Sequence, residues 1–206
     1  MRLNHTGIDI DHSRGDVRRI LEKEKISHVI IATPTHTHYG WLTFLKDFDG
    51  IRILCEKPIT KNLGELLEII GWGLDLTMMY QYLHAKINAT EKNPSSLTSY
   101  NFYNHGNDGL VWDCIQLIGL ADGEISLRED SPTWETRING RKVYPGSINN
   151  SYVEFLNDWI YGDSAEEQSQ EDLLELHEKA YKLQEKVIYD GRHNSLHWHP
   201  GQDEQH

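Results

Sequence analysis

The chain has few cysteines and no long apolar run. Its two cysteines, Cys55 and Cys114, both stand in apolar segments, so we expect buried free thiols in a reducing compartment rather than a domain built on disulfides. No apolar run approaches the roughly 20 residues that cross a membrane. The residues after Met1 also lack the apolar stretch of a signal peptide. These absences predict a globular, cytoplasmic protein.

Basic residues are also scarce. The 206 residues contain 20 Lys and Arg against 32 Asp and Glu, which gives a formal net charge of -12. A surface of that sign repels phosphate groups. The charge balance therefore excludes nucleic acid and anionic membranes as expected partners.

The third absence is a glycine-rich turn. Gly7 and Gly15 are the only glycines before residue 16, and neither belongs to a Gly-x-Gly-x-x-Gly pattern. Such a turn lets backbone amides and a helix N-terminus approach the pyrophosphate of a dinucleotide. The sequence therefore shows no source for that phosphate contact.

The first 82 residues nevertheless alternate between helical and strand patterns. Apolar runs with β-branched residues predict strands that are buried on both faces, and amphipathic segments between them predict helices. Alternation of this kind favours a parallel sheet with right-handed crossovers. The expected strands are 28–32, 51–55 and 74–79. The first expected helix lies between Asp16 and Lys25, with Ser13 or Asp16 as its cap, and the second runs from Thr35 or Thr37 to about Lys46. Asn62 can cap the third, which has an apolar side of Leu63, Leu66, Leu67 and Ile70.

The pattern changes after residue 82. We expect a reduced α+β domain over 83–189, with a hairpin turn at Asn139-Gly140, followed by a loose, polar, His-rich tail over 190–206. The second domain begins with a strand and a helix, continues with antiparallel strands and ends with two amphipathic helices. These elements are predicted at 97–103, 109–120, 124–127, 133–138 and 141–144, then around Ile148 to Trp159 and Leu173 to Val187.

Two short motifs follow the predicted strands. The first is Ala32-Thr33-Pro34 with a histidine at position 38, and the second is Glu56-Lys57-Pro58. Together, at this spacing and in this strand context, they resemble the Gfo/Idh/MocA oxidoreductases. Gly109 to Asp113 and the closing helices also resemble that family. The resemblance identifies the chain as an N-terminally truncated and shortened member, with an α/β fold that joins a truncated Rossmann-like parallel sheet to the reduced α+β domain.

The resemblance implies roles for particular residues. Lys57 would be the catalytic lysine and Asp113 its helper, because an ammonium group can hydrogen-bond a reacting hydroxyl and steady the developing oxyanion. NAD or NADP would be the cofactor, and a small carbohydrate the substrate. The family's open sheet implies a homo-oligomer or a subunit of a larger assembly. The residues that would bind the cofactor are Thr33, Pro34, His38, Glu56 and Pro58.

The chain departs from the family pattern in two further places. The acidic residue expected at the ribose has only Asp9 or Asp11 as a substitute. The histidine expected one turn after Asp113 is replaced by Gln116 and Leu117, neither of which is a general base near neutral pH. His84 and His105 are the alternatives for that base.

Histidines elsewhere raise the question of a metal site. His36 and His38 are spaced like a pair of metal ligands, but they stand at a predicted helix start, where capping or packing is the simpler role. The tail histidines have the residue type that transition metals prefer, yet in a loose polar tail we expect them to be solvated. The sequence therefore predicts no metal. The tail histidines are His193, His197, His199 and His206.

Two hypotheses remain open at this point. The first is an NAD(P)-dependent oxidoreductase that acts on a sugar or a sugar-nucleotide-like substrate. The second is a catalytically degenerate relative that serves as a binding or structural subunit. The intact Glu56-Lys57-Pro58 motif favours the first hypothesis, and the absent glycine turn and histidine favour the second.

Overall fold

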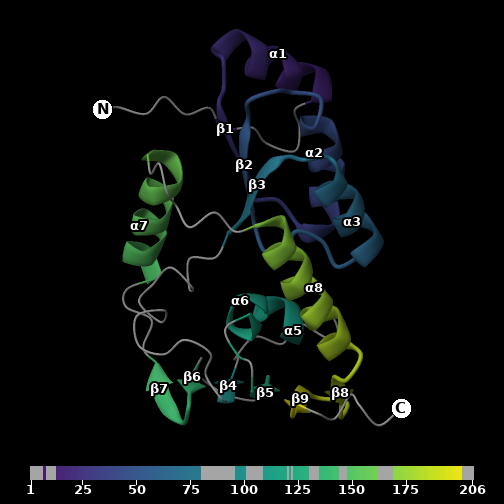
Figure 1. Cartoon of the computed structure of the whole chain (residues 1–206), viewed down its shortest axis with the longest axis vertical. Helices are drawn as coiled ribbons and strands as arrows, with labels where there is room; N and C mark the ends of the chain where they lie inside the picture. The colour runs from purple at the N-terminus through teal and green to yellow at the C-terminus, as the bar shows by residue number, and fades with distance from the viewer. Residues whose placement is uncertain are drawn as a thin grey trace.

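The computed structural model of the chain contains two sheets joined by helices (Figure 1). It describes residues 7, 13–79, 96–100, 109–119, 121, 123–129, 135–143, 148–161 and 169–200. Asp9, Asp11, His84, His105 and His206 lie outside these ranges. Within them, no helix is both long and apolar enough to cross a membrane. Both cysteines are free and buried, as the sequence predicts.

The first sheet has three parallel strands in the order β1-β2-β3. They are β1 (His28–Ile31), β2 (Arg52–Cys55) and β3 (Asp75–Met78). Helix α1 (Arg14–Glu24) precedes the sheet. The short 3-10 turn η1 (Thr35–Thr37) and helix α2 (His38–Leu45) connect β1 to β2. Helix α3 (Leu63–Gly71) connects β2 to β3. This arrangement confirms the predicted α/β fold and its parallel pairing.

Local sequence signals explain where two of these helices begin. The hydroxyl of Ser13 accepts a hydrogen bond from the backbone N–H of Asp16 at 3.2 Å, and the amide oxygen of Asn62 accepts one from Glu65 at the same distance. Each side chain thereby satisfies an N–H that the first helical turn leaves without a partner. Asn62 is the predicted cap, and of the two alternatives for the first helix, Ser13 and Asp16, the structure has Ser13.

Burial in this sheet differs from the prediction at two positions. Strand β1 is not buried on both faces, because Ile30 is 46% exposed. The reason is that β1 is an edge strand within the described residues, with β2 as its only neighbour there. On α3, Leu67 is 51% exposed, while Leu66 and Ile69 are buried. The buried stripe of α3 therefore lies beside the predicted one.

The second sheet has six strands in the order β7-β6-β4-β5-β9-β8. Asn139 and Gly140 both have positive φ, 49° and 74°, which confirms the predicted hairpin turn between β6 and β7. Strand β5 pairs with β4 in parallel, so the expectation of a purely antiparallel set is wrong there. The strands are β4 (Ser96–Tyr100), β5 (Glu124–Arg128), β6 (Glu135–Ile138), β7 (Arg141–Val143), β8 (Ile188–Tyr189) and β9 (Asn194–Trp198).

The prediction of a loose tail from residue 190 is wrong for residues 190–198. Strand β9 lies inside the sheet, antiparallel to both β5 and β8. Leu196 is buried against the core, and Asn194 is also buried and donates to the Glu129 carboxylate at 3.2 Å. A polar composition hid this strand, because only one of its two faces is apolar.

Helix α8 (Gln170–Gln184) joins the two sheets. It contacts α3 on one side, and on the other it contacts α5 (Leu110–Asp113) and α6 (Ile115–Ile118). The continuous helix predicted over 109–120 is thus two short helices that meet at Cys114 (φ -95°, ψ 6°). The apolar residues of α8 belong to one core cluster with residues of both sheets. The molecule therefore folds around a shared core.

Helix α7 (Ile148–Tyr161) packs against the first sheet apart from α1, α2 and α3 (Figure 1). Phe155 and Trp159 are fully buried there against Leu54 and Met79, as their helical spacing predicts. Arg52 of β2 donates to the main-chain oxygen of Trp159 at 3.1 Å. The parallel sheet is thereby covered on both faces by helices from distant parts of the chain.

Candidate active site at the ends of the parallel strands

The loops that follow β1 and β2 lie side by side at the carboxyl edge of the parallel sheet. The N–H of Glu56 donates to the oxygen of Ile31 at 2.8 Å, and the N–H of Met79 donates to that of Cys55 at 2.7 Å. These bonds continue the strand ladder past the strand ends. Open α/β sheets bind ligands at this edge, so the two sequence motifs stand in the expected place.

Lys57 and Asp113 form an ion pair between this edge and α5. The Lys57 ammonium lies 3.1 Å from the Asp113 Oδ1 atom and 3.4 Å from the Asp113 main-chain oxygen. The two side chains are 20% and 28% exposed. The structure thus joins two residues that are 56 positions apart in sequence, and that the resemblance alone had placed in one site.

This pair has the composition of an acid–base site. An ammonium group carries three donors; two of them bond to Asp113, which fixes its position, and the third is available to a ligand hydroxyl or carbonyl oxygen. Partial burial lowers the effective dielectric constant, so the charge of Lys57 acts more strongly on a nearby oxyanion than it would in bulk water. The arrangement suits proton exchange with a hydroxyl group.

His38 fastens the two loops together. Its side chain is fully buried, with Nε2 2.7 Å from the Thr33 oxygen and Nδ1 3.0 Å from the Pro58 oxygen and 3.2 Å from that of Ile59. Carbonyl oxygens only accept, so a ring nitrogen that carries a proton donates to one loop or the other. In this structure the buried His38 ring therefore lies between the Ala-Thr-Pro and Glu-Lys-Pro loops and hydrogen-bonds to one of them.

The other predicted cofactor residues make local contacts in the same loops. The hydroxyl of Thr33 lies 2.6 Å from that of Thr37, whose hydroxyl donates to the Pro34 oxygen at 2.8 Å. The N–H of Lys57 donates to the carboxylate of Glu56 at 3.0 Å. Thr33 and Pro34 are exposed, whereas Pro58 is buried. The first loop thus presents a surface to a ligand, and the second orients Lys57.

A dinucleotide fits this edge in part. Lys57 with Asp113 offers donors for the reacting end of a substrate, and the exposed Thr33 and Pro34 lie beside it. The loops after β1 and β2 contain Pro34 and Pro58, which have no N–H for a phosphate. Among the described residues, no glycine-rich turn follows a parallel strand. The described residues therefore fit the nicotinamide end of the cofactor, and among them we find no cradle for its pyrophosphate.

Neither residue that stands in place of the expected histidine can act as a general base. Leu117 is buried in the core, and Gln116 lies in α6. The acidic group that meets Lys57 is Asp113, whose carboxylate accepts a hydrogen bond from the lysine ammonium.

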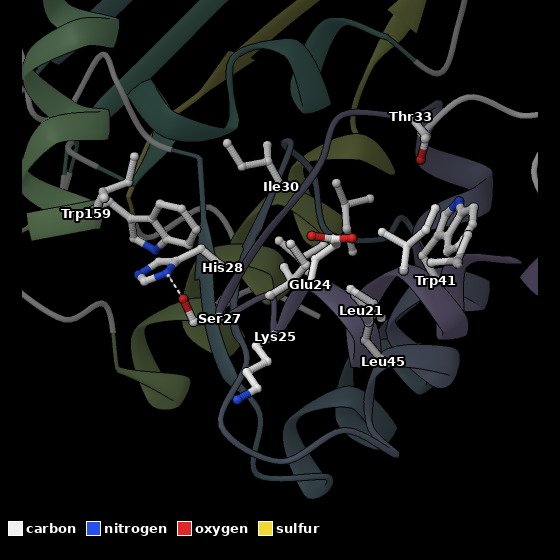
Figure 2. Close-up of a pocket in the computed structure, with 16 residues that line it drawn as sticks. Leu21, Glu24, Lys25, Ser27, His28, Ile30, Thr33, Trp41, Leu45 and Trp159 are labelled. Atoms are coloured by element: carbon white, nitrogen blue, oxygen red, sulfur yellow. Dashed lines mark hydrogen bonds between the residues drawn. The ribbon is translucent and has the colours of Figure 1, made fainter. Parts of the chain in front are cut away.

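An apolar groove runs along the open edge of β1 (Figure 2). Its volume is about 500 Å³. Leu21, Trp41 and Leu45 line one side, and Trp159 lines the other, where its ring meets His28 edge-on at 5.2 Å. No local pattern in the sequence predicts this groove, since its walls come from α1, α2, β1 and α7. The signal in the sequence was the apolar character of the strand itself.

Burial shifts the pKa of three groups outside the Lys57–Asp113 pair. It lowers the pKa of His177 on α8 to about 4, and the hydrogen bond from Nδ1 to the Leu173 oxygen opposes this only in part. Burial also lowers the pKa of His28, with a smaller effect from the Arg52 charge, and raises that of the Cys55 thiol. Each group is held in its uncharged form, so none of them is an activated nucleophile.

Residues 6–71 match the model of the Gfo/Idh/MocA family, described as an oxidoreductase family with an NAD-binding Rossmann fold. None of the curated proteins matches the chain at a significant level. Solved structures resemble it over most of its length, although at low identity.

One such structure is the WlbA (WbpB) dehydrogenase from Thermus thermophilus in complex with NAD and UDP-GlcNAcA, 14% identical, TM-score 0.58, covering 83% of this chain and 76% of that chain. Another is the UDP-N-acetylglucosamine 3-dehydrogenase GnnA from Acidithiobacillus ferrooxidans, which is 16% identical with a TM-score of 0.58. The match covers 82% of this chain and 80% of that chain. A third is a myo-inositol dehydrogenase from Corynebacterium glutamicum, which is 14% identical with a TM-score of 0.56. The match covers 87% of this chain and 83% of that chain.

These likenesses show that the fold is shared with dehydrogenases, and the family match places the two strand-end motifs in their Rossmann domain. The resemblance predicted from the sequence is confirmed over residues 6–71, which match the Gfo/Idh/MocA oxidoreductase family model, and the solved structures share the fold.

Proposed function

We propose that this chain carries the catalytic edge of an NAD(P)-dependent oxidoreductase whose substrate is a sugar or a sugar-nucleotide-like alcohol. The observation that carries the proposal is the Lys57–Asp113 pair, 3.1 Å apart and partly buried at the carboxyl edge of a parallel sheet. The family match supports the reaction class. Two structural neighbours, the dehydrogenase in complex with NAD and UDP-GlcNAcA and the UDP-N-acetylglucosamine 3-dehydrogenase, support the substrate class.

Each residue has a stated role in this proposal. The nicotinamide supplies the site that accepts or returns a hydride. Lys57 donates a hydrogen bond to the substrate oxygen and exchanges the hydroxyl proton, and Asp113 holds the ammonium in place. His38 keeps the two loops together, so that Lys57 stays on the face that Thr33 and Pro34 share.

Cofactor binding is the first test. NAD(H) and NADP(H) are titrated separately into the full chain while tryptophan fluorescence and nicotinamide emission are followed. The proposal expects saturable binding of at least one of them. Flat titrations to millimolar cofactor would contradict it for the isolated chain.

Turnover tests the role of Lys57. Lys57→Ala is expected to lower turnover about 10²- to 10⁴-fold, the range for loss of an acid–base group, while cofactor affinity changes little. Lys61→Ala, an exposed lysine four residues later, is the matched control and is expected to keep full activity. If the Lys57→Ala variant turned over as fast as the wild-type chain, Lys57 would have no part in the mechanism.

A second candidate function rests on the groove along β1. We infer that this edge accepts a β-strand from another polypeptide, which makes the chain a subunit of a larger assembly. Within the described residues, only β2 pairs with β1. The strand's free edge has main-chain donors and acceptors, and the groove walls are apolar on both sides of the sheet. A strand that is apolar on both faces fits these two requirements together.

The exposed edge residue offers a test of this second candidate. Ile30→Lys places a charge in the groove and is expected to abolish any self-association or partner binding that sedimentation or co-purification detects. Leu67→Lys, an equally exposed leucine on α3, is the matched control. A complex that survives Ile30→Lys unchanged would show that the β1 edge is not the contact surface.

A further inference from the structure

Three polar side chains gather on one face of the six-stranded sheet, whereas Lys57 follows a strand of the parallel sheet. They are Glu124 at the start of β5, His197 in β9, and His199 directly after β9. None of them takes part in the site described above. They form a separate cluster, which we call the β5–β9 cluster.

The strand register explains why these residues meet. Strands β5 and β9 are antiparallel, and Ile125 pairs with Trp198, so Glu124 lies directly opposite His199. Side chains alternate between the faces of a strand, which puts residues 197 and 199 on one face. Ile125 and Leu196 face the other way and are buried. The buried side of the two strands therefore fixes the orientation of the exposed side.

The geometry brings three donor atoms close together. His197 Nε2 lies 3.5 Å from Glu124 Oε1, and His199 Nδ1 lies 3.9 Å from Glu124 Oε2. The two imidazole rings are edge-to-face with centroids 4.5 Å apart, and the ligand atoms of all three residues lie within 4.8 Å of one another. Donors bound at about 2.1 Å to a tetrahedral ion stand about 3.4 Å apart, so small side-chain rotations suffice.

The donor set identifies the kind of ion. Two imidazole nitrogens and one carboxylate oxygen suit zinc and its neighbours in the first transition series, whereas calcium and magnesium prefer oxygen ligands alone. Three protein ligands leave one tetrahedral position for water or for a group from another molecule. The partial exposure of all three side chains gives the ion a path of entry.

We propose that Glu124, His197 and His199 bind a divalent transition-metal ion, with Zn²⁺ as the best match. The bound ion fastens the end of β9 to the start of β5, which lie side by side in the sheet. Its affinity depends on the folded sheet, because 73 positions of sequence separate Glu124 from His197.

The test uses the full chain freed of metal with a chelator. Zn²⁺ is titrated by calorimetry, and Co²⁺ is titrated while its visible absorption is recorded, since four-coordinate Co²⁺ absorbs far more strongly than the aqueous ion. We expect one tight equivalent of each metal, and an absorption spectrum of four-coordinate Co²⁺.

Variants assign the binding to the cluster. Glu124→Gln, His197→Ala and His199→Ala are each expected to weaken binding by at least about tenfold. His193→Ala is the matched control, because this exposed histidine lies on the same hairpin outside the cluster. Circular dichroism of each variant shows whether the fold persists.

Thermal unfolding gives a second readout that needs no enzyme activity. Zn²⁺ is expected to raise the melting temperature of the wild-type chain and of the Lys57→Ala variant equally, and to leave that of Glu124→Gln unchanged. Tight binding that persists in the triple variant, or equal weakening in the His193→Ala control, would overturn the proposal. The oxidoreductase proposal stands or falls independently of either result.

Discussion

The two sheets of this molecule differ in how far apart in sequence their neighbouring strands lie. In the parallel sheet, β1, β2 and β3 pair in chain order, with one helix between each pair. In the six-stranded sheet, β5 pairs with β4 and with β9, which is separated from β5 by two helices and three strands. Local patterns are sufficient to predict the first arrangement, whereas the second depends on contacts that no short pattern encodes.

The sheets also differ in where their reactive groups lie. The parallel sheet presents Lys57 with Asp113 at its carboxyl edge, partly shielded by α5. The six-stranded sheet presents Glu124, His197 and His199 on an open face. Partial burial favours electrostatic catalysis, while exposure favours capture of an ion from solution. The chain therefore holds one polar cluster that is partly buried at a sheet edge and another that is exposed on a sheet face.

The largest expected effect comes from breaking the core that joins the sheets. Leu66 on α3 is fully buried, and α3 packs against α8. Leu66→Ala is expected to lower the free energy of unfolding by about 2–5 kcal/mol, because it leaves a cavity where both sheets meet. Urea unfolding followed by far-UV circular dichroism and by tryptophan fluorescence measures this.

Leu67 supplies the control for this prediction. It is the next residue along α3 but is 51% exposed, so Leu67→Ala is expected to change the free energy of unfolding by less than about 0.5 kcal/mol. The two probes are expected to report one transition, since a single core cluster spans both sheets. Separate transitions for the two sheets would contradict the shared core.

The next effect concerns His177, which lies on α8 between the two regions. Its pKa is lowered by burial to about 4 in the folded chain, against an ordinary value near 6.5 when unfolded. The unfolded chain therefore binds more protons between these values. Stability is expected to fall as pH drops from about 6.5 to about 4, by up to about 3 kcal/mol from this group.

Urea midpoints measured across this pH range check the linkage. His177→Gln keeps an N–H donor but does not titrate, and it is expected to show a shallower fall in stability over the same window. Parallel curves for the wild-type chain and this variant would show that His177 does not control the acid sensitivity.

A third prediction sharpens the account of the parallel sheet. His38→Ala removes the buried imidazole that lies between the oxygens of Thr33 and Pro58, and it is expected to cost about 2 kcal/mol of stability through the lost hydrogen bond and packing. Turnover should fall as well, because the loop that carries Lys57 loses its support. His36→Ala, an exposed neighbour in η1, is expected to be close to neutral. Equal effects of the two substitutions would contradict the bridging role.

The smallest prediction concerns the start of α8. Ser169 and Asp172 form a reciprocal capping box, in which each side chain accepts from the other residue's N–H at 3.0 Å. Ser169→Ala is expected to destabilise the chain by about 1 kcal/mol, as measured by thermal unfolding. Gln170→Ala, the next residue, serves as the control, and a loss of stability as large as that of Ser169→Ala would argue against the cap.

Sequence patterns predicted the parallel half closely. The apolar runs at β1, β2 and β3 and the caps at Ser13 and Asn62 are local features, and the structure contains all of them. The prediction failed where exposure depends on position in the sheet, as at Ile30 on a strand that is at the edge of the described sheet, or where helical phase is ambiguous by one position, as at Leu67.

The candidate sites follow the same division. Lys57 and Asp113 were assigned through a family resemblance, and the structure brings them together. His38 was expected at the cofactor, yet its contacts here are to two loops, which no residue pattern reveals. The histidines of the last segment were expected to be solvated because that segment is polar. Their neighbour across the strands, Glu124, lies far away in sequence, so no local pattern joins it to them.

By itself the sequence determined the α/β class, the parallel order of the first three strands and the two loops at their carboxyl ends, because hydrophobic period and turn chemistry act over a few residues. Only the tertiary structure decided that Lys57 meets Asp113, that β9 lies within a sheet, and that Glu124 faces two histidines. These outcomes depend on which distant segments pack together, and that choice is made by the burial of a shared core.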